Sequence, residues 1–499
     1  MRWLLLTLFV STQLLAETFD VVIIGAGVSG TYTGWRLVEG GKKDVHIFEG
    51  SDRIGGRIYT THLPGMDNVP VELGAMRFHP SHKRLDALVK YLKLETAPFT
   101  QENENNFIYV RGKRFREKDE KELPYSLPAG EEGHDPYALV IGLLGKIDVN
   151  LSTDNWAKRK KTARYKGQSL YDVSWQNFLL ENLSSEAFQM LVDLGYVQMV
   201  ADVSVASAFS NFIEGASGAP LKFVHGYQLL PDTLANNFQQ KGGKLHLNHH
   251  LMSVSYEGEK ETFRYRLLFY DQEGAFKPVY AKHLILTITP PALKLLAQQS
   301  PALQNNDFRE KLDLFTPNPL TKLYLGYRYP WWQKLGLQSG SSVTTLPIRS
   351  CYYFGSEAEA PGGEPDNNNS LILASFQGLY TPFWQSFNEG AEFAPNLGKD
   401  AAWQAEKQLE ILHGVHNMPS AYTGTFVDWS DPPHFGAYFF WRVGAHPQEV
   451  IEYMLHPFVA EPLYVIGSAY SQHQGWVEGC LETSDALLDK YFFIPPPKW

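Results

Sequence analysis

The sequence is short of cysteine, of positive charge and of long apolar runs, and each shortage excludes a class of protein. Only Cys351 and Cys480 occur among 499 residues, so a disulfide scaffold is excluded, although one bridge between them remains open. The formal net charge of −10 argues against nucleic-acid binding. Beyond the N-terminal segment, no stretch is long and apolar enough for a membrane span. What remains is a globular chain long enough for two or three domains.

The N-terminal segment has the layout of a secretory signal peptide over residues 1–16. Arg2 precedes an apolar run from Trp3 to Val10, and small or apolar residues lead to Ala16. We therefore expect Sec-type export, cleavage after Ala16 and a secreted or periplasmic protein. The alternative is a disordered or buried N-terminal strand. The export signal is favoured because the next strand already begins at Thr18 and leaves the segment no place in the fold.

A βαβ unit follows directly. Phe19 to Ile24 is a short apolar run rich in β-branched residues, as expected of a buried parallel strand. The letters GAGVSG come next, then a helical stretch from Thr31 to Glu39 and a second strand from Val45 to Phe48 that ends at Glu49. A GxGxxG motif alone is weak evidence, but strand, motif, helix, strand and acid in this order predict dinucleotide binding.

Each residue of that motif has a physical role. Gly25 permits a tight turn, Gly27 lets the backbone approach a pyrophosphate, and Gly30 lets helix and strand pack closely. The helix N-terminus offers free N–H groups to the phosphates, and Glu49 can accept hydrogen bonds from a ribose.

A second glycine pair stands in SDRIGGR, from Ser51 to Arg57, directly after the ribose acid. This pair is not part of the nicotinamide version of the motif and resembles the extended FAD fingerprint of flavin amine oxidases. Arg57 is then expected to meet a phosphate; the alternative is a glycine turn with a solvated arginine.

The middle of the chain is less informative. Residues 100–135 are polar and are expected at the surface, and serine-capped helices are expected between 170 and 200. His246, His249 and His250 suggest a metal site, but their alternation along a strand and the lack of further ligands favour ordinary histidines, so no metal is expected.

An arginine in VELGAMRFHP has no acidic residue beside it. Turns of this kind are usually built from small and polar residues, yet Arg77 stands between Met76 and Phe78. Its role is implied by the family resemblance described next, and the chemistry agrees with that role, because a planar guanidinium matches a carboxylate with two parallel hydrogen bonds. The alternative is an arginine paired with a backbone carbonyl or a phosphate.

Together these blocks resemble one family. GAGVSG, DRIGGR, ELGAMR, GGKLHL, TKLYLGYRYPWW and GSAYSQHQGWVEG occur in the order found in flavin-dependent L-amino acid oxidases of the flavin amine oxidase superfamily, from about Phe19 to Tyr491. The resemblance implies a mixed α/β fold: a Rossmann-like FAD-binding domain, a discontinuous mixed-sheet substrate domain and a helical insertion. The expected boundaries are 17–95, 222–320 and 455–492 for the FAD-binding domain, 96–130 and 321–454 for the substrate-binding domain, and 131–221 for the insertion.

The resemblance also implies site residues. Arg77 would hold the substrate carboxylate, helped by Tyr352 or Tyr353, of which strand alternation lets only one face the pocket; we expect Tyr353. The Gly475 carbonyl would accept from the substrate amine, Trp476 would form an aromatic wall, and Lys322 would hold a water near flavin N5, its alternative being a solvated lysine at a strand edge. Catalytic roles therefore fall on Lys322 and Arg77. The expected FAD contacts are Gly25, Gly27, Val28, Ser29, Gly30, Glu49, Gly50, Arg57, Gly74, Ala75, Met76, Arg77, Leu251, Gly467, Ser468, Gly475, Trp476 and Val477.

Three features depart from the family pattern or leave it open. Ser468 stands where many relatives have a glutamate that holds the ribityl chain. FIEGASGAP contains no histidine where some members have one in the active site. GAMRFHP also resembles the amino-acid 2-monooxygenases, so the fate of oxygen is open.

The implied reaction is FAD-dependent oxidation of an L-amino acid by dioxygen to the 2-oxo acid, with release of ammonia and hydrogen peroxide. The alternatives are a 2-monooxygenase that makes an amide, a polyamine or monoamine oxidase, and a non-catalytic flavin-binding secreted protein. Arg77 argues against the second, since simple amines have no carboxylate. The preferred side chain and the oligomeric state stay open, with a homodimer as one arrangement.

Overall fold

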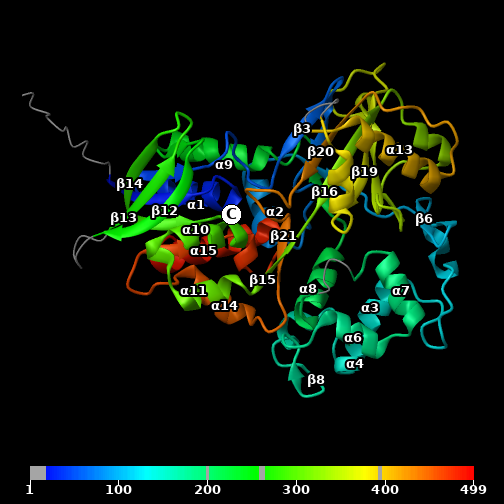
Figure 1. The fold of residues 1–499 in the computed structure, drawn as a ribbon, viewed down its shortest axis with the longest axis horizontal. Helices are drawn as coiled ribbons and strands as arrows, with labels where there is room; N and C mark the ends of the chain where they lie inside the picture. Colours follow the sequence, from blue (N-terminus) through cyan, green and yellow to red (C-terminus); the bar gives the residue numbers. More distant parts are fainter. Residues whose placement is uncertain (1–17, 198–201, 258–263, 391–395) are drawn as a thin grey trace, which may run out of the picture.

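The chain folds into three parts (Figure 1). The computed structural model describes residues 18–197, 202–257, 264–390 and 396–499. A sheet with helices on its face, a second sheet covered by a long helix, and a group of short helices are seen as separate bodies in the view. The predicted signal peptide, residues 1–16, lies outside the described residues. The predicted α/β class with a Rossmann-like part, a second mixed sheet and a helical insertion is confirmed; the residue boundaries given above are our proposal for these parts.

The first sheet has seven strands in the order β11-β2-β1-β14-β13-β12, with β22 also paired to β14. Neighbours around β1 run parallel, whereas β13 and β12 are antiparallel. The strands are β1 (Thr18–Ile24), β2 (Val45–Phe48), β11 (Lys244–His246), β12 (His250–Glu257), β13 (Arg264–Tyr270), β14 (Phe276–Leu286) and β22 (Leu463–Val465). One face packs on α1 (Val28–Glu39), α9 (Leu229–Gln240) and α15 (Val477–Phe492). The other packs on α10 (Pro290–Gln299), α11 (Asn306–Leu312) and α14 (Pro447–Leu455).

The predicted βαβ unit is confirmed, and two glycines explain its shape. Gly25 has φ +105°, in the region that favours glycine, and ends β1 with a tight turn. A Cβ on Gly30 would lie 1.9 Å from the Gly25 carbonyl oxygen, so α1 can pack this close to β1 only with glycine there. The sequence thus brings the N-terminus of α1 to the carboxyl edge of the sheet.

The second sheet runs in the order β20-β16-β19-β18-β17-β6-β7. Its strands are β6 (Phe107–Val110), β7 (Lys113–Arg116), β16 (Thr321–Tyr327), β17 (Ser341–Thr344), β18 (Ser350–Ser356), β19 (Ser370–Gln377) and β20 (Thr423–Asp428). One face is covered by α13 (Lys399–His413) and by α12 (Thr381–Phe387). The opposite face packs against the hairpin β3 (Thr60–Leu63) and β4 (Met66–Glu72) and the turn after it. Residues 100–135, expected at the surface, therefore include two paired strands, with Val110 fully buried.

The helical part has its own core. It contains α3 (Pro136–Gly142), α4 (Leu144–Ile147), α5 (Trp156–Arg159), α6 (Trp175–Asn182), α7 (Ser185–Asp193) and α8 (Val205–Gly215). Ser174 and Ser184 cap α6 and α7 through their side chains, which confirms the predicted serine caps, and Ser204 caps α8, which was not predicted. In the part of the chain that the structure describes, no helix is long and apolar enough to cross a membrane.

Short elements join these parts. α2 (Lys83–Tyr91) packs on α15, β5 (Thr96–Pro98) pairs with β10 (Leu221–Phe223), and β15 (Phe315–Asn318) pairs with β21 (Tyr438–Trp441). The remaining strands are β8 (Arg164–Tyr165) and β9 (Gln168–Ser169), which pair with each other. These links bring segments far apart in sequence to the edge of the first sheet.

Candidate active site

A cavity of about 1170 Å³ lies between the first sheet, the second sheet and α8. It exceeds the roughly 300–1,000 Å³ of a pocket for a drug-sized ligand, so it can hold a long ligand together with a small one. All predicted FAD-contact residues except Gly30 line it, as do the predicted substrate residues Lys322, Arg77, Gly475 and Trp476, whereas the predicted Tyr352 and Tyr353 are not among its lining residues. Sequence reasoning therefore identified residues that the fold gathers around one space.

The nucleotide end of the cavity is the turn between β1 and α1. Gly27 forms an isolated bridge with Gly55, and a Cβ at Gly27 would meet nothing closer than 3.9 Å, so the backbone here is open to a ligand. The Glu49 carboxylate accepts from the Ala26 N–H at 2.8 Å through Oε2, while Ser51 donates to Oε1. These bonds fix the acid that is predicted to receive a ribose.

Leu251 and Gly50 line the same end, as predicted. His249 and His250 also line it, whereas His246 stacks between rings in the sheet. Among the described residues, no group of three or more His, Cys, Asp and Glu side chains is arranged to hold a metal ion. Cys351 and Cys480 are both free thiols, so the bridge left open above is not formed.

Arg57 lies in the middle of the cavity wall. Its guanidinium donates to the Ala437 carbonyl at 2.8 Å and to the Ser468 hydroxyl at 3.1 Å. Ser468, the residue at the family's glutamate position, thus serves as an acceptor for this arginine. Burial lowers the pKa of Arg57, because its positive charge is removed from water. An anionic group beside it would stabilise that charge.

The turn from Glu72 to Arg77 is held from the second sheet by three side chains. Lys322 Nζ donates to the carbonyls of Glu72 and Gly74 at 2.8 and 2.6 Å, and Tyr324 donates to the Glu72 carbonyl at 2.7 Å. Trp429 Nε1 donates to the Leu73 carbonyl at 2.7 Å. The carbonyls of Glu72, Leu73 and Gly74 therefore each have a buried donor, which fixes the path of the first half of the turn.

Lys322 is 1% exposed, which excludes the alternative of a solvated lysine at a strand edge. Burial lowers its pKa, and the nearby Glu72 carboxylate opposes that shift. Burial likewise raises the pKa of Glu72, whose carboxylate accepts from Thr60 and from the Tyr227 N–H. Lys322 therefore loses its proton more readily than a solvated lysine, and from the cavity wall it holds the turn by hydrogen bonds.

Arg77 ends this turn with its guanidinium short of partners. Its Nε and Nη1 atoms are buried and have no hydrogen-bond partner among the described residues. The guanidinium lies 5.4 Å from the centre of the Phe99 ring, which supports one face of it. Buried N–H groups of a cation without acceptors are costly, so this arrangement favours an anionic ligand in the cavity.

The expectation that Tyr353 faces the pocket is wrong. Its hydroxyl lies 2.6 Å from Ser342 Oγ and 2.7 Å from His413 Nε2, in the core on the α13 side of the sheet. Tyr352 is on the opposite face and contacts Phe99 and Phe376, of which Phe99 also supports Arg77 and Phe376 lines the cavity. Adjacent residues of β18 do point to opposite faces of the sheet, as predicted, but Tyr352 and not Tyr353 lies on the face of Phe99 and Arg77.

Gly475, Trp476 and Val477 close the cavity at the N-terminus of α15. Gly475 has φ +82°, and Trp476 is the N-cap residue, with no side-chain hydrogen bond to the first turn. The 16-residue helix therefore presents its positive end to this part of the cavity.

Several lining residues were not predicted. They lie in loops or, for Cys480, in α15, and include Tyr227, Thr287, Trp429, Gln474 and Cys480. One signal was readable: Thr287 follows β14, and loops at the carboxyl ends of parallel strands bind ligands in open α/β sheets.

Comparisons with known proteins agree with this geometry. Residues 28–485 match the family model described as flavin containing amine oxidoreductase. The chain is 24% identical to Aplysianin-A of Aplysia kurodai, covering 95% of this chain and 90% of that one. It is 28% identical to an L-amino-acid oxidase of Mus musculus, covering 93% of this chain and 69% of the relative. A solved structure of putrescine oxidase bound to putrescine matches with a TM-score of 0.69 at 17% identity, covering 95% of this chain and 98% of that one.

The residues present fit FAD. The glycine turn leaves room for a pyrophosphate, Glu49 stands at the end of β2, and Arg57 lies farther along the same cavity. FAD is the cofactor of this protein, an oxidoreductase. The chain belongs to the flavin containing amine oxidoreductases.

Proposed function

We propose that the protein oxidises an L-amino acid to the imino acid, with dioxygen as the final acceptor reduced to hydrogen peroxide, and that water hydrolyses the imino acid to the 2-oxo acid and ammonia. The observation that carries the proposal is the Arg77 guanidinium, with two buried nitrogens lacking partners, in the cavity that holds the cofactor cradle. An amine without a carboxylate would leave these N–H groups unpaired. The carboxylate of an α-amino acid would pair with one edge of the guanidinium through two charged hydrogen bonds.

The roles of the chain's own residues follow from their positions. Arg77 would bind the substrate carboxylate, and Tyr352, on the same side of the sheet, would add a hydroxyl. The Gly475 carbonyl would accept from the amine, and the Trp476 indole would exclude water from one side of the substrate. FAD, when bound, supplies the electron acceptor for the oxidation.

Lys322 would act in two ways. It holds the turn that carries Arg77 through the carbonyls of Glu72 and Gly74. Its lowered pKa would also let Nζ exchange a proton, or hold a water by its remaining N–H, near neutral pH. Both roles depend on its burial, so they are lost together if the lysine is replaced.

The test is product analysis with purified FAD-loaded protein. The twenty L-amino acids, their D-enantiomers and putrescine would be offered under saturating oxygen without catalase. We expect peroxide, ammonia and 2-oxo acid in equal amounts from some L-amino acids only. Amide and carbon dioxide would assign a 2-monooxygenase, oxidation of putrescine alone would assign an amine oxidase, and no flavin bleaching with any compound would assign a non-catalytic flavoprotein.

We also propose that the protein is exported, on the basis of the apolar segment before Ala16. N-terminal sequencing of protein from the medium or periplasm should begin at Glu17. Light scattering of the same material would measure whether it forms the homodimer considered above.

A further inference from the structure

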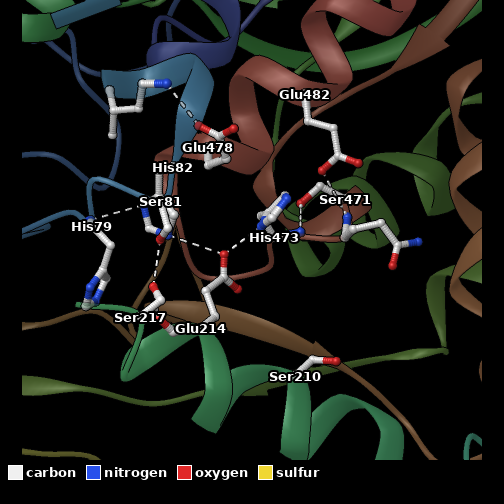
Figure 2. Close-up of polar contacts among 12 residues, drawn as sticks. His79, Ser81, His82, Ser210, Glu214, Ser217, Ser471, His473, Glu478 and Glu482 are labelled. Carbon is white, nitrogen blue, oxygen red and sulfur yellow. Dashed lines mark hydrogen bonds and ion pairs between the residues drawn. The ribbon is translucent and has the colours of Figure 1, made fainter. Parts of the chain in front are cut away.

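A polar cluster of His79, His82, Glu214 and His473 lies where three distant segments meet (Figure 2). His79 and His82 come from the segment that leads into α2, Glu214 from the last turn of α8, and His473 from the loop before α15. Glu214 belongs to the helical part, whereas the histidines flank the cofactor part. The cluster therefore joins two parts of the molecule at the substrate end of the cavity.

Glu214 contacts two histidines through one oxygen. Its Oε1 atom lies 2.6 Å from His473 Nδ1 and 3.3 Å from His82 Nε2. His82 Nδ1 accepts from the His79 backbone N–H at 3.3 Å, so a neutral His82 ring carries its proton on Nε2, the atom that faces Glu214. The contact with His82 lies within ion-pair distance but does not meet hydrogen-bond geometry, whereas the contact with His473 is a hydrogen bond.

The charges of the cluster support each other. Burial alone would raise the pKa of Glu214, but His473 and His82 outweigh it and lower that pKa. Burial alone would lower the pKa of His473, but Glu214 outweighs it and raises that pKa. The carboxylate is therefore ionised at neutral pH and favours a protonated His473.

The histidine rings pack directly on Trp476. His79 meets the indole edge-on at 5.1 Å between ring centres, and His82 lies 4.8 Å away. Trp476 lines the cavity, as does the adjacent Gly475, while neither His79 nor His82 reaches it. The cluster is thus the support of the aromatic wall and does not face the substrate itself.

The helix that carries Glu214 also faces the cavity. Asn211 and Gly215 of α8 line the same space. Since Glu214 stands between them in the last turn, its bond to His473 fixes both α8 and the loop that leads to Gly475 and Trp476.

We propose that Glu214 is a positioning residue that sets Trp476 and Gly475 at the substrate end of the cavity through His82 and His473. This inference deepens the proposed oxidation of an amino acid and rests on it for the kinetic effect. The segment that follows α8 has two further contacts with the cofactor part: Ser81 with Ser217, and His79 Nδ1 with the Gly218 carbonyl at 3.2 Å.

Ser81 provides a matched control. Its hydroxyl lies 2.6 Å from the Ser217 hydroxyl and joins the same two segments as the His82–Glu214 contact. The side chain is exposed and has no ring contact with Trp476. Ser81→Ala therefore weakens the attachment of α8 and leaves the support of Trp476 in place.

The experiment compares full-length, FAD-loaded Glu214→Ala, Glu214→Gln and Ser81→Ala. We expect Glu214→Ala to retain FAD but lose about tenfold in kcat/KM, a size typical of coupled neighbours. Glu214→Gln, which keeps an oxygen acceptor, should recover part of the loss, and Ser81→Ala should match the wild type. Wild-type kcat/KM in Glu214→Ala, or equal losses in Glu214→Ala and Ser81→Ala, would overturn the proposal.

A double-mutant cycle with Trp476→Phe separates action through the indole from a general loss of stability. If Glu214 acts through Trp476, the double variant should lose less than the product of the two single losses. The visible absorption band of bound FAD gives a readout independent of turnover: Glu214→Ala should change it as Trp476→Phe does. This spectrum tests the support of Trp476 even if no amino acid is oxidised; a band altered by Trp476→Phe and unchanged by Glu214→Ala would refute the inference.

Discussion

Two glycine-containing turns, 20 residues apart, each bring an arginine to the same cavity, and the two arginines differ in whether their guanidinium groups have protein acceptors. Arg57, at the end of DRIGGR, has a carbonyl and a hydroxyl as acceptors. Arg77, at the end of ELGAMR, has two buried nitrogens without acceptors. The arginine of the first turn already has protein acceptors, and a bound cofactor would add to them. The arginine of the second turn needs a ligand as the acceptor for its unpaired nitrogens.

The difference has a cause in how each turn is held. Gly74 lies so close to the first turn that a Cβ there would be 2.1 Å from the Arg57 carbonyl oxygen. The second turn is also clamped by Lys322, Tyr324 and Trp429 through its carbonyls. These bonds fix the backbone that carries Arg77, and the Nε and Nη1 atoms of its side chain have no acceptor among the described residues. A rigid turn with an unsatisfied cation is a pre-organised anion site.

The largest effect should come from the cofactor end. Gly30→Ala places a Cβ 1.9 Å from the Gly25 carbonyl oxygen, and backbone must move to admit it. We expect purified Gly30→Ala to be colourless, with the flavin absorption band lost and not restored by added FAD. Gly142→Ala is the matched control, because a Cβ there meets nothing within 4 Å. A yellow Gly30→Ala protein with normal FAD content would show that the close approach of α1 and β1 is not required.

The second effect concerns the unsatisfied arginine. Arg77→Ala should lower kcat/KM on L-amino acids by about a hundredfold, the cost of a bidentate charged contact. Arg77→Lys should recover only part, since an ammonium is a point charge. Amino-acid amides, which lack the carboxylate, should be poor substrates of the wild type and lose little on mutation.

The control for Arg77 is Arg349→Ala. That guanidinium is buried and donates to the carbonyls of Val192 and Asp193, away from the cavity. Its loss should lower thermal stability and leave the preference for acids over amides unchanged. If Arg77→Ala lowers activity on acids and amides equally, Arg77 supports the cofactor and not the carboxylate.

The third effect tests the clamp. Lys322→Met leaves the Glu72 and Gly74 carbonyls without this donor, and two lost hydrogen bonds of about 1 kcal/mol each correspond to roughly thirtyfold in kcat/KM. FAD should stay bound, as measured by absorption. Lys222→Met, an exposed lysine near the same Glu72 carboxylate, should have little effect. If the rates of the reductive and oxidative half-reactions are unchanged in Lys322→Met, Lys322 has a packing role only.

Sequence reasoning succeeded where a local pattern dictates geometry. A β-branched run, glycines at fixed spacing and serine caps gave β1, β2, the cradle and the helices α6 and α7. It failed where the outcome depends on which surface a strand packs against. Strands β6 and β7 lie in a polar stretch, and their place in the sheet depends on the pairing of β6 with β17, a strand more than 200 residues further along the chain. The Glu214–His473 contact joins residues 259 apart, and no local signal marks it.

The smallest expected effect comes from Tyr352 and Tyr353, which lie on opposite faces of strand β18. Tyr352 shares its neighbour Phe99 with Arg77, so Tyr352→Phe should raise KM for L-amino acids about threefold, the size of one modest hydrogen bond, with kcat little changed. Tyr353 bonds to Ser342 and His413 in the opposite core, so Tyr353→Phe should lower the melting temperature and leave KM alone. Each variant is the control of the other, since both remove one hydroxyl from adjacent residues of β18. A raised KM in Tyr353→Phe with none in Tyr352→Phe would mean that the carboxylate is reached from the α13 side, and Arg77 could then no longer be its partner.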